Sequence, residues 1–182
     1  MSKRIRLPAS KTEAQAAATT RRWLERGARD VGRDFTKPDD DWDPIWLVVS
    51  RDSGLLIASD ETVHKHDMAE LVGATARRLG AICVGHVHSS WLILFTEIDE
   101  PRRSELVRHM QETGGETEGV PERIEILMLA VYTASTSAMW YGRIERHDDA
   151  PPTLARFERA PTDGETTGAM VDPLRAGLVK LG

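Results

Sequence analysis

Apolar residues recur along the chain in short runs and in one clear helical stripe, and this pattern predicts strands alternating with helices. Short runs rich in β-branched, aromatic and aliphatic residues, bounded by turn-forming residues, are typical of strands. The expected strands cover residues 45–50, 55–59, 81–87, 91–95, 123–133, 138–146 and 153–159. The third and fourth runs form either one long strand with a break at Ser89-Ser90 or two short strands.

The clearest helical stripe lies at residues 67–79, where apolar residues recur three and four positions apart. Asp67 is the expected N-cap, and Gly80 is expected to form the left-handed turn that ends the helix. Further helices are expected at 11–33, 101–113 and 173–181. Because short turns join neighbouring strands, we expect an α+β fold: a mostly antiparallel sheet of five or six strands with two or three packed helices.

Composition divides the chain into four parts. We expect a basic, partly helical N-terminal arm at 1–37 and an acidic linker at 38–44 that is bracketed by prolines. An α+β domain follows at 45–159, and a polar C-terminal tail with a short helix occupies 160–182. The length of 182 residues agrees with a single domain plus tails.

The net charge of −5 is unevenly distributed. Residues 1–37 carry ten Lys or Arg against four Asp or Glu, a net charge of +6, so the rest of the chain carries −11. Such an arm binds an acidic partner or lies against the acidic surface of its own chain or of a neighbouring copy. No ladder of aromatic residues accompanies the basic residues, which favours protein contacts over nucleic acid. Nucleic-acid binding is the alternative, through Arg21, Arg22, Arg26, Arg29 and Arg33.

Several classes of protein are disfavoured by composition. No run of apolar residues is long enough to span a membrane, and the basic N-terminus lacks the apolar segment of a signal peptide. The single cysteine, Cys83, cannot form a disulfide within the chain and lies in an apolar run. We therefore expect a cytoplasmic protein that makes no contact with a membrane.

Two segments carry a resemblance to a known group of proteins. Residues 87–91 read Val-His-Ser-Ser-Trp, and residues 121–125 read Pro-Glu-Arg-Ile-Glu. The chain resembles, over roughly 45–158, a widespread group of uncharacterised proteins from bacteria and their phages. Its members share a Val-Ser-Glu-Ala-Trp strand and a later Pro-Asp-Arg-x-Glu segment. Ser89 replaces the glutamate of the group, and Glu122 stands where the group has aspartate. The resemblance implies an architecture and no activity.

A His-x-His pair offers the best candidate for catalytic chemistry. Alternate residues of a strand share a face, so His86 and His88 can share a metal ion, and a site built from this pair together with His64 and His66 is one alternative. The spacing from this pair to Asp99 resembles that of the JAMM metallopeptidases, in which two histidines and an aspartate bind zinc. The resemblance implies a zinc-dependent peptidase or isopeptidase with Glu61 or Glu70 as the general base. Against it, the segment between His88 and Asp99 is strand-like, whereas in that family it is a loop.

The alternative is that the histidines have structural roles. His86 and His88 are then half-buried strand residues with satisfied ring nitrogens, while His64 and His66 are exposed before a helix. The sequence contains no phosphate-binding loop, dinucleotide fingerprint or nucleophile elbow. Trp42, among aspartates, either anchors a partner or folds back on the sheet. We expect a non-catalytic protein without a cofactor, which binds another protein or its own copy through Trp42, Arg22 and Arg26.

Overall fold

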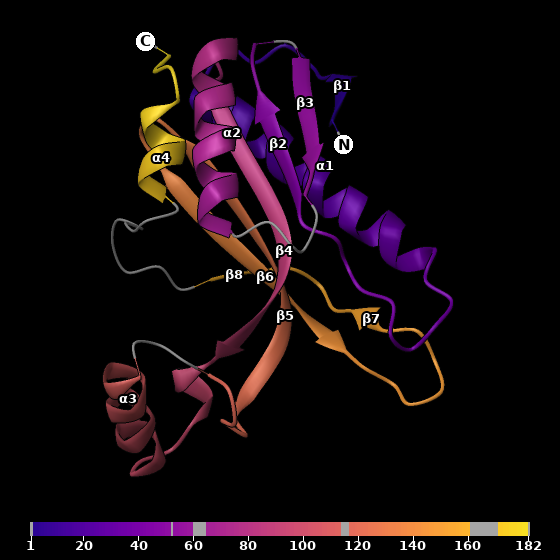
Figure 1. Cartoon of the computed structure of the whole chain (residues 1–182), viewed down its shortest axis with the longest axis vertical. Helices are drawn as coiled ribbons and strands as arrows, with labels where there is room; N and C mark the ends of the chain where they lie inside the picture. The colour runs from indigo at the N-terminus through magenta and orange to yellow at the C-terminus, as the bar shows by residue number, and fades with distance from the viewer. Residues whose placement is uncertain (1, 52, 60–64, 114–116, 161–170, 182) are drawn as a thin grey trace.

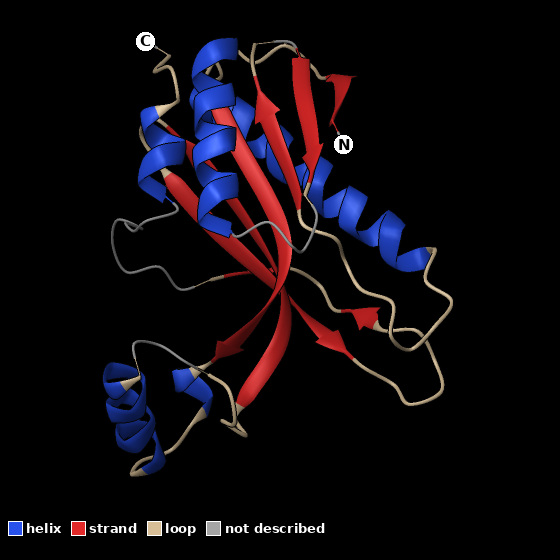
Figure 2. Cartoon of the chain, in the orientation of Figure 1, coloured by secondary structure: helices blue, strands red, loops and turns tan. Residues whose placement is uncertain are grey.

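The computed structural model describes residues 2–51, 53–59, 65–113, 117–160 and 171–181, with the backbone alone at 65 and 66. These residues form four α-helices, one short 3-10 helix and eight strands of a curled, antiparallel sheet (Figures 1 and 2). The predicted α+β class and the antiparallel pairing are confirmed. The expected five or six strands were too few. None of the described helices has the length and apolar character needed to cross a bilayer.

The helices are α1 (Glu13–Arg33), α2 (Lys65–Leu79), α3 (Arg102–Glu112) and α4 (Val171–Ala176), with η1 at Phe95–Glu97. The strands are β1 (Ser2–Arg6), β2 (Ile45–Val49), β3 (Ser53–Ala58), β4 (Cys83–Ile93), β5 (Arg123–Thr133), β6 (Ser137–Glu145), β7 (Thr153–Leu154) and β8 (Glu158–Arg159). Of the two readings of residues 81–95, the single long strand is the one observed.

The sheet follows the order β1-β3-β2-β4-β5-β6-β7, and β8, outside this path, also pairs with β6. The long strands β4 and β5 run through its centre, paired along the whole length of both. The short turns expected between neighbouring strands are confirmed for β2 with β3 and for β5 with β6, which form antiparallel hairpins. Two strands were not expected: β1, which pairs with β3 at one edge, and the division of 153–159 into β7 and β8.

One face of the sheet is covered by α1. Leu24 and Ala28 of this helix enter a core with Leu47 of β2 and Leu129 of β5. Gly85 of β4 lets the helix approach closely, because a Cβ atom there would lie 2.6 Å from side-chain carbons of Leu24 and Thr20. The N-terminal segment predicted as an arm is therefore an integral layer of the fold.

The opposite face is covered by α2 and α4. The strand residues that point to this face alternate with those of the first core. Trp46, Val48 and Val84 belong to this second set. They pack in a second core with Val72 of α2 and Leu174 of α4. The two helices meet at their backbones, where a Cβ on Gly73 would collide with the carbonyl oxygen of Pro173. The structure is thus a three-layer arrangement, α1 on one side of the sheet and α2 with α4 on the other.

Helix α2 ends as predicted, with Gly80 at a φ of +57°. It begins at Lys65 and not at Asp67, so the expected N-cap lies inside the first turn. Helix α1 is capped by Thr12, whose hydroxyl accepts a hydrogen bond from the Gln15 N–H. Two residues earlier, Ser10 donates its backbone N–H to the carbonyl oxygen of Arg51.

Residues 88–126 extend beyond the helix-covered half of the sheet, and we call them the projection. Here β4 pairs with β5 alone among the described strands, because its pairing with β2 ends at Val87. The first three residues of β5, before Ile126, are likewise not paired with β6. The chain from β4 passes through η1 and α3 before it returns as β5, and α3 lies apart from the other helices (Figure 2).

The projection has a small core of its own. Ile93, Leu106 and Val120 are buried there, with Phe95, Ile98 and Met110 packed around them. This core holds α3 against the end of the β4–β5 ladder.

Candidate functional site

The His-x-His pair lies inside the fold. His86 and His88 point from β4 toward the face that α2 covers, with their Nδ1 atoms 3.0 Å apart and their rings nearly parallel. His86 is fully buried, and its Nε2 lies 3.2 Å from the Tyr132 hydroxyl. The Trp46 ring of β2 stacks on the His86 ring, with centroids 4.4 Å apart. Both ring nitrogens of His86 therefore have hydrogen-bond partners.

Burial controls the protonation of this cluster. Removal from water, followed by the nearby charge of His88, lowers the pKa of His86 well below its ordinary value of 6.5. Burial also raises the pKa of Tyr132 to about 12. A neutral His86 has a single N–H, so it donates to one neighbour and accepts from the other. The result is a hydrogen-bonded row of three side chains under α2, which can hold the core polar groups in place or carry a proton along the row.

The proposed zinc ligands are not all brought together. His86 and His88 supply two nitrogens, whereas a zinc site takes at least three protein ligands. Among the residues that the structure describes, no three His, Cys, Asp or Glu side chains are grouped closely enough to hold a metal ion. The segment after His88 continues as strand to Ile93 and then as η1, so Asp99 follows the far end of β4.

Of the remaining residues considered for a metal site, one is described by the structure and the others are not. Glu70 is an exposed residue of α2. Glu61 and His64 lie outside the described residues, as does the side chain of His66. The zinc peptidase stays a prediction from spacing.

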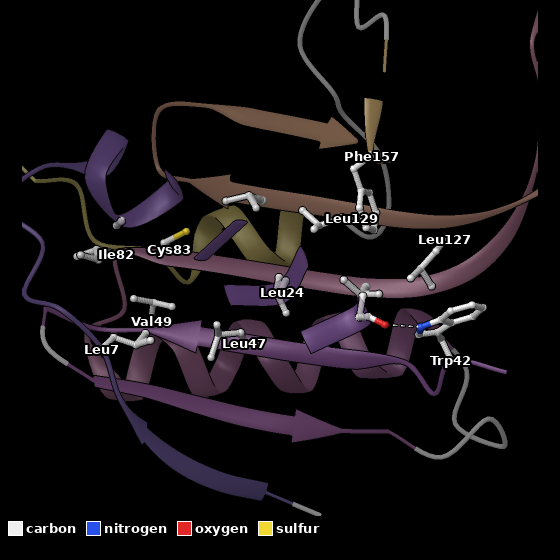
Figure 3. Close-up of a cluster of buried hydrophobic side chains, with 14 of the residues drawn as sticks. Leu7, Leu24, Trp42, Leu47, Val49, Ile82, Cys83, Leu127, Leu129 and Phe157 are labelled. Atoms are coloured by element: carbon white, nitrogen blue, oxygen red, sulfur yellow. Dashed lines mark hydrogen bonds between the residues drawn. The ribbon is translucent and has the colours of Figure 1, made fainter. Parts of the chain in front are cut away.

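Trp42 folds back into the core, which corrects the idea that it anchors a partner at the surface. Its side chain is 3% exposed, and its Nε1 donates a 2.8 Å hydrogen bond to the carbonyl of Ala28 in α1 (Figure 3). Phe35 packs edge-on against it. The segment read as an acidic linker therefore closes over the end of α1.

Trp91, unlike Trp42, lies at the surface. It stands in an apolar run of the sequence, yet 46% of it is exposed on the distal part of β4. The Arg123 guanidinium of β5 lies over its ring, 4.2 Å from the centroid. These two residues are diagonal neighbours on the ladder, since Trp91 pairs with Glu125 and Arg123 pairs with Ile93. The two segments that carry the sequence resemblance thus meet at this stacked pair.

Ion pairs and hydrogen bonds fix the shape of the projection around this pair. Arg102 at the start of α3 forms a two-pronged ion pair with Glu122, with N–O distances of 2.6 and 3.0 Å. The neighbouring Arg103 donates two hydrogen bonds to the carbonyl of Ile98. Arg102 lowers the pKa of the Glu122 carboxyl. Planar Arg–carboxylate pairs of this kind fix orientation as well as distance, so α3 is tied to the segment that leads into β5 just before Arg123.

The outward face of α1 is a third feature. Arg22, Arg26, Arg29 and Arg33 recur at helical spacing and form what we call the arginine stripe. Glu25 pairs with Arg29, and Asp30 pairs with Arg33. Arg22 and Arg26 are exposed, and among the described residues neither has an ion-pair partner. Arg21 does not belong to the stripe, because it stacks over Trp140 of β6.

Comparison of the chain with protein-family models, with curated proteins and with solved structures gave no match.

Sequence reasoning missed Trp91 and Arg123 as surface residues. A signal for them was present: Ser89, Trp91 and the cross-strand Glu125 fall on one face of the ladder, and two of these three are polar. A tryptophan that shares a strand face with polar residues is more often at a surface than an all-apolar run suggests.

Proposed function

We propose that this chain is a protein-binding module whose contact surface is the projection, with Trp91 as its anchor. The observation that carries the proposal is the Trp91–Arg123 stack, a half-exposed tryptophan held by an arginine at the end of a two-stranded ladder. Tryptophan and arginine are the residues most enriched among those that dominate binding energy at protein interfaces.

The surroundings of the pair support a role in binding. A second large apolar side chain, Val107 of α3, is 41% exposed in the same projection. No described strand pairs with the other edge of β4 along the part that carries Trp91. The ion pair of Arg102 with Glu122 limits the freedom of α3, and a rigid surface loses less entropy on binding.

Folding alone gives no reason for this arrangement. Trp91 is not among the residues that form the small core of the projection, which consists of Ile93, Leu106 and Val120. An exposed tryptophan contributes little to stability through burial, and its contact with Arg123 is of the order of 0.5–1 kcal/mol at such a site. Partner contact gives the side chain a use that the isolated fold does not.

Site-specific photo-crosslinking tests the proposal directly. Trp91 is replaced by the photoreactive residue benzoylphenylalanine, and the full-length chain is irradiated in the cells that express it. The matched control carries the same residue in place of Leu71, which is 55% exposed on α2. Mass spectrometry then identifies the residues of any crosslinked chain.

We expect protein adducts from position 91 that map to one surface of one partner, and none above background from position 71. Adducts of equal yield from both positions, or no adduct from position 91, would contradict a binding role for the projection.

A further inference from the structure

The two ends of the molecule carry opposite charges. The projection, residues 88–126, has nine Asp or Glu and four Arg, a net charge of −5. Residues 1–37 have a net charge of +6, of which α1, with five Arg against three Asp or Glu, carries +2. Complementary potentials of this kind steer association and select partners.

Unpaired charges remain on both surfaces. In the described part of the projection, Asp99, Glu100, Glu112 and Glu118 are exposed and have no ion-pair partner. On α1 the corresponding cations are Arg22 and Arg26. Glu112 is the last residue of α3, a position where a negative charge opposes the helix dipole. Each surface thus presents charges that the isolated chain leaves unused.

The two surfaces cannot meet within one chain. In Figure 1, α3 lies at the lower left of the molecule, and α1 lies along the upper right, with the sheet between them. The two surfaces can therefore pair with each other only between two molecules.

A hollow beside the arginine stripe offers a place for an aromatic anchor. Gly32, Pro152 and Leu154 line it together with Arg29 and Arg33, and its volume is about 220 Å³. It combines apolar surface with two guanidinium groups, which are the groups that stack on an indole ring.

We infer that the partner of the projection is a second copy of this chain. The acidic projection of each copy lies on the arginine stripe of the other, and Trp91 enters the hollow beside it. This inference rests on the proposed binding role of the projection. Two identical contacts form together in a closed pair, the commonest symmetry of protein assemblies.

The arginine stripe also argues against nucleic acid as its occupant. Glu25 and Asp30 lie among the four arginines and would repel phosphates, and the whole chain has a net charge of −5. The projection carries arginines as well as carboxylates, so a surface of this kind can pair with Glu25 and Asp30 as well as with the arginines of the stripe.

Charge reversal with rescue tests the inference on the purified, full-length chain. The first variant carries Arg22→Glu and Arg26→Glu, and the second carries Glu112→Arg and Glu118→Arg. All four positions are exposed, and arginine at the end of α3 suits the helix dipole, so both variants should fold. Sedimentation velocity measures association from micromolar to submillimolar concentration, at low and at high salt. As a second measurement, the unaltered chain and the first variant, which we call the stripe variant, are each mixed with a labelled DNA duplex.

We expect the unaltered chain to dimerise, more weakly at high salt, and each variant alone to associate at least about tenfold more weakly. The two variants mixed should associate again, because each restores the charge that the other has lost. A chain that is monomeric throughout would overturn the inference, as would association unaffected by the reversals or not rescued by mixing. Salt-sensitive DNA binding lost with the stripe variant would also overturn it. Crosslinks from position 91 to a different protein would overturn the second copy as partner and leave the binding role of the projection intact.

Discussion

The helix-covered half of the sheet and the projection are built on the same two strands but differ in how they are supported. In the covered half, β4 and β5 lie between α1 on one face and α2 with α4 on the other, and each face has an extensive core. In the projection, the helices beside the same strands are η1 and α3, and the core has three buried residues among those that the structure describes. The covered half is organised for folding, and the projection presents side chains to solvent.

Two tryptophans show how the two regions differ in burial. Trp42, from a segment rich in aspartate, is buried and hydrogen-bonded at the covered half, while Trp91, from an apolar run, is half-exposed in the projection. The polarity of the neighbouring sequence predicts the opposite in both cases. Burial is decided by whether a helix lies over the residue in the folded chain.

The largest expected effect comes from matched leucine truncations in the two regions. Leu47 of β2 and Leu106 of α3 are both almost fully buried. We expect Leu47→Ala to lower the free energy of unfolding of the whole domain by about 2–5 kcal/mol, because it leaves a cavity in the core under α1. Leu106→Ala should instead release the projection locally.

Urea unfolding and hydrogen–deuterium exchange separate the two outcomes. In Leu106→Ala, exchange should rise in residues 94–113 and stay protected at Leu47 and Val48, with a smaller shift of the urea midpoint than in Leu47→Ala. Equal loss of protection in both regions would show that the projection and the covered half unfold as one unit.

A smaller effect is expected from pH, and it belongs to the covered half. His86 is neutral in the folded chain because its pKa is lowered, whereas in the unfolded chain it binds a proton below about pH 6.5. Stability should therefore fall as the pH drops through 6.5 and should be constant, for this group, above it. One proton gives a slope of at most about 1.4 kcal/mol per pH unit.

The urea midpoint between pH 8 and pH 5 measures this slope. The double variant His86→Leu with Tyr132→Phe removes His86 together with the Tyr132 hydroxyl that bonds to it, and it should flatten the slope. His147→Gln, at an exposed turn, is the control and should leave the slope unchanged. If the double variant keeps the full slope, another group is responsible for the acid sensitivity.

Local patterns in the sequence were enough to predict the elements of the covered half. The apolar stripe of α2 and the turn at Gly80 specify a helix and its end without reference to the rest of the chain. Both hairpins follow from short apolar runs joined by small polar residues. Strand β1 could not be found in this way, because Ser2–Arg6 is a charged segment that becomes a strand only by pairing with β3.

The candidate site depended on contacts between distant residues, which local patterns do not contain. Trp91 and Arg123 meet only through the register of β4 on β5, and Arg102 reaches Glu122 only once α3 has folded back. The histidine spacing was visible in the sequence, but the partner of His86, Tyr132, lies on another strand. Arg22 and Arg26 were correctly located on a helix.

The most direct measurement of the central claim compares stability and binding in the same variant, Trp91→Ala. Its partner is the chain that the crosslinks from position 91 identify. We expect the free energy of unfolding to change by less than about 1 kcal/mol, since only the contact with Arg123 is lost. The dissociation constant should rise at least about tenfold, as for a residue that anchors an interface. Trp42→Ala should behave in the opposite way and lose about 3–5 kcal/mol of stability. A dissociation constant unchanged by Trp91→Ala would contradict the assignment of the projection as the binding surface.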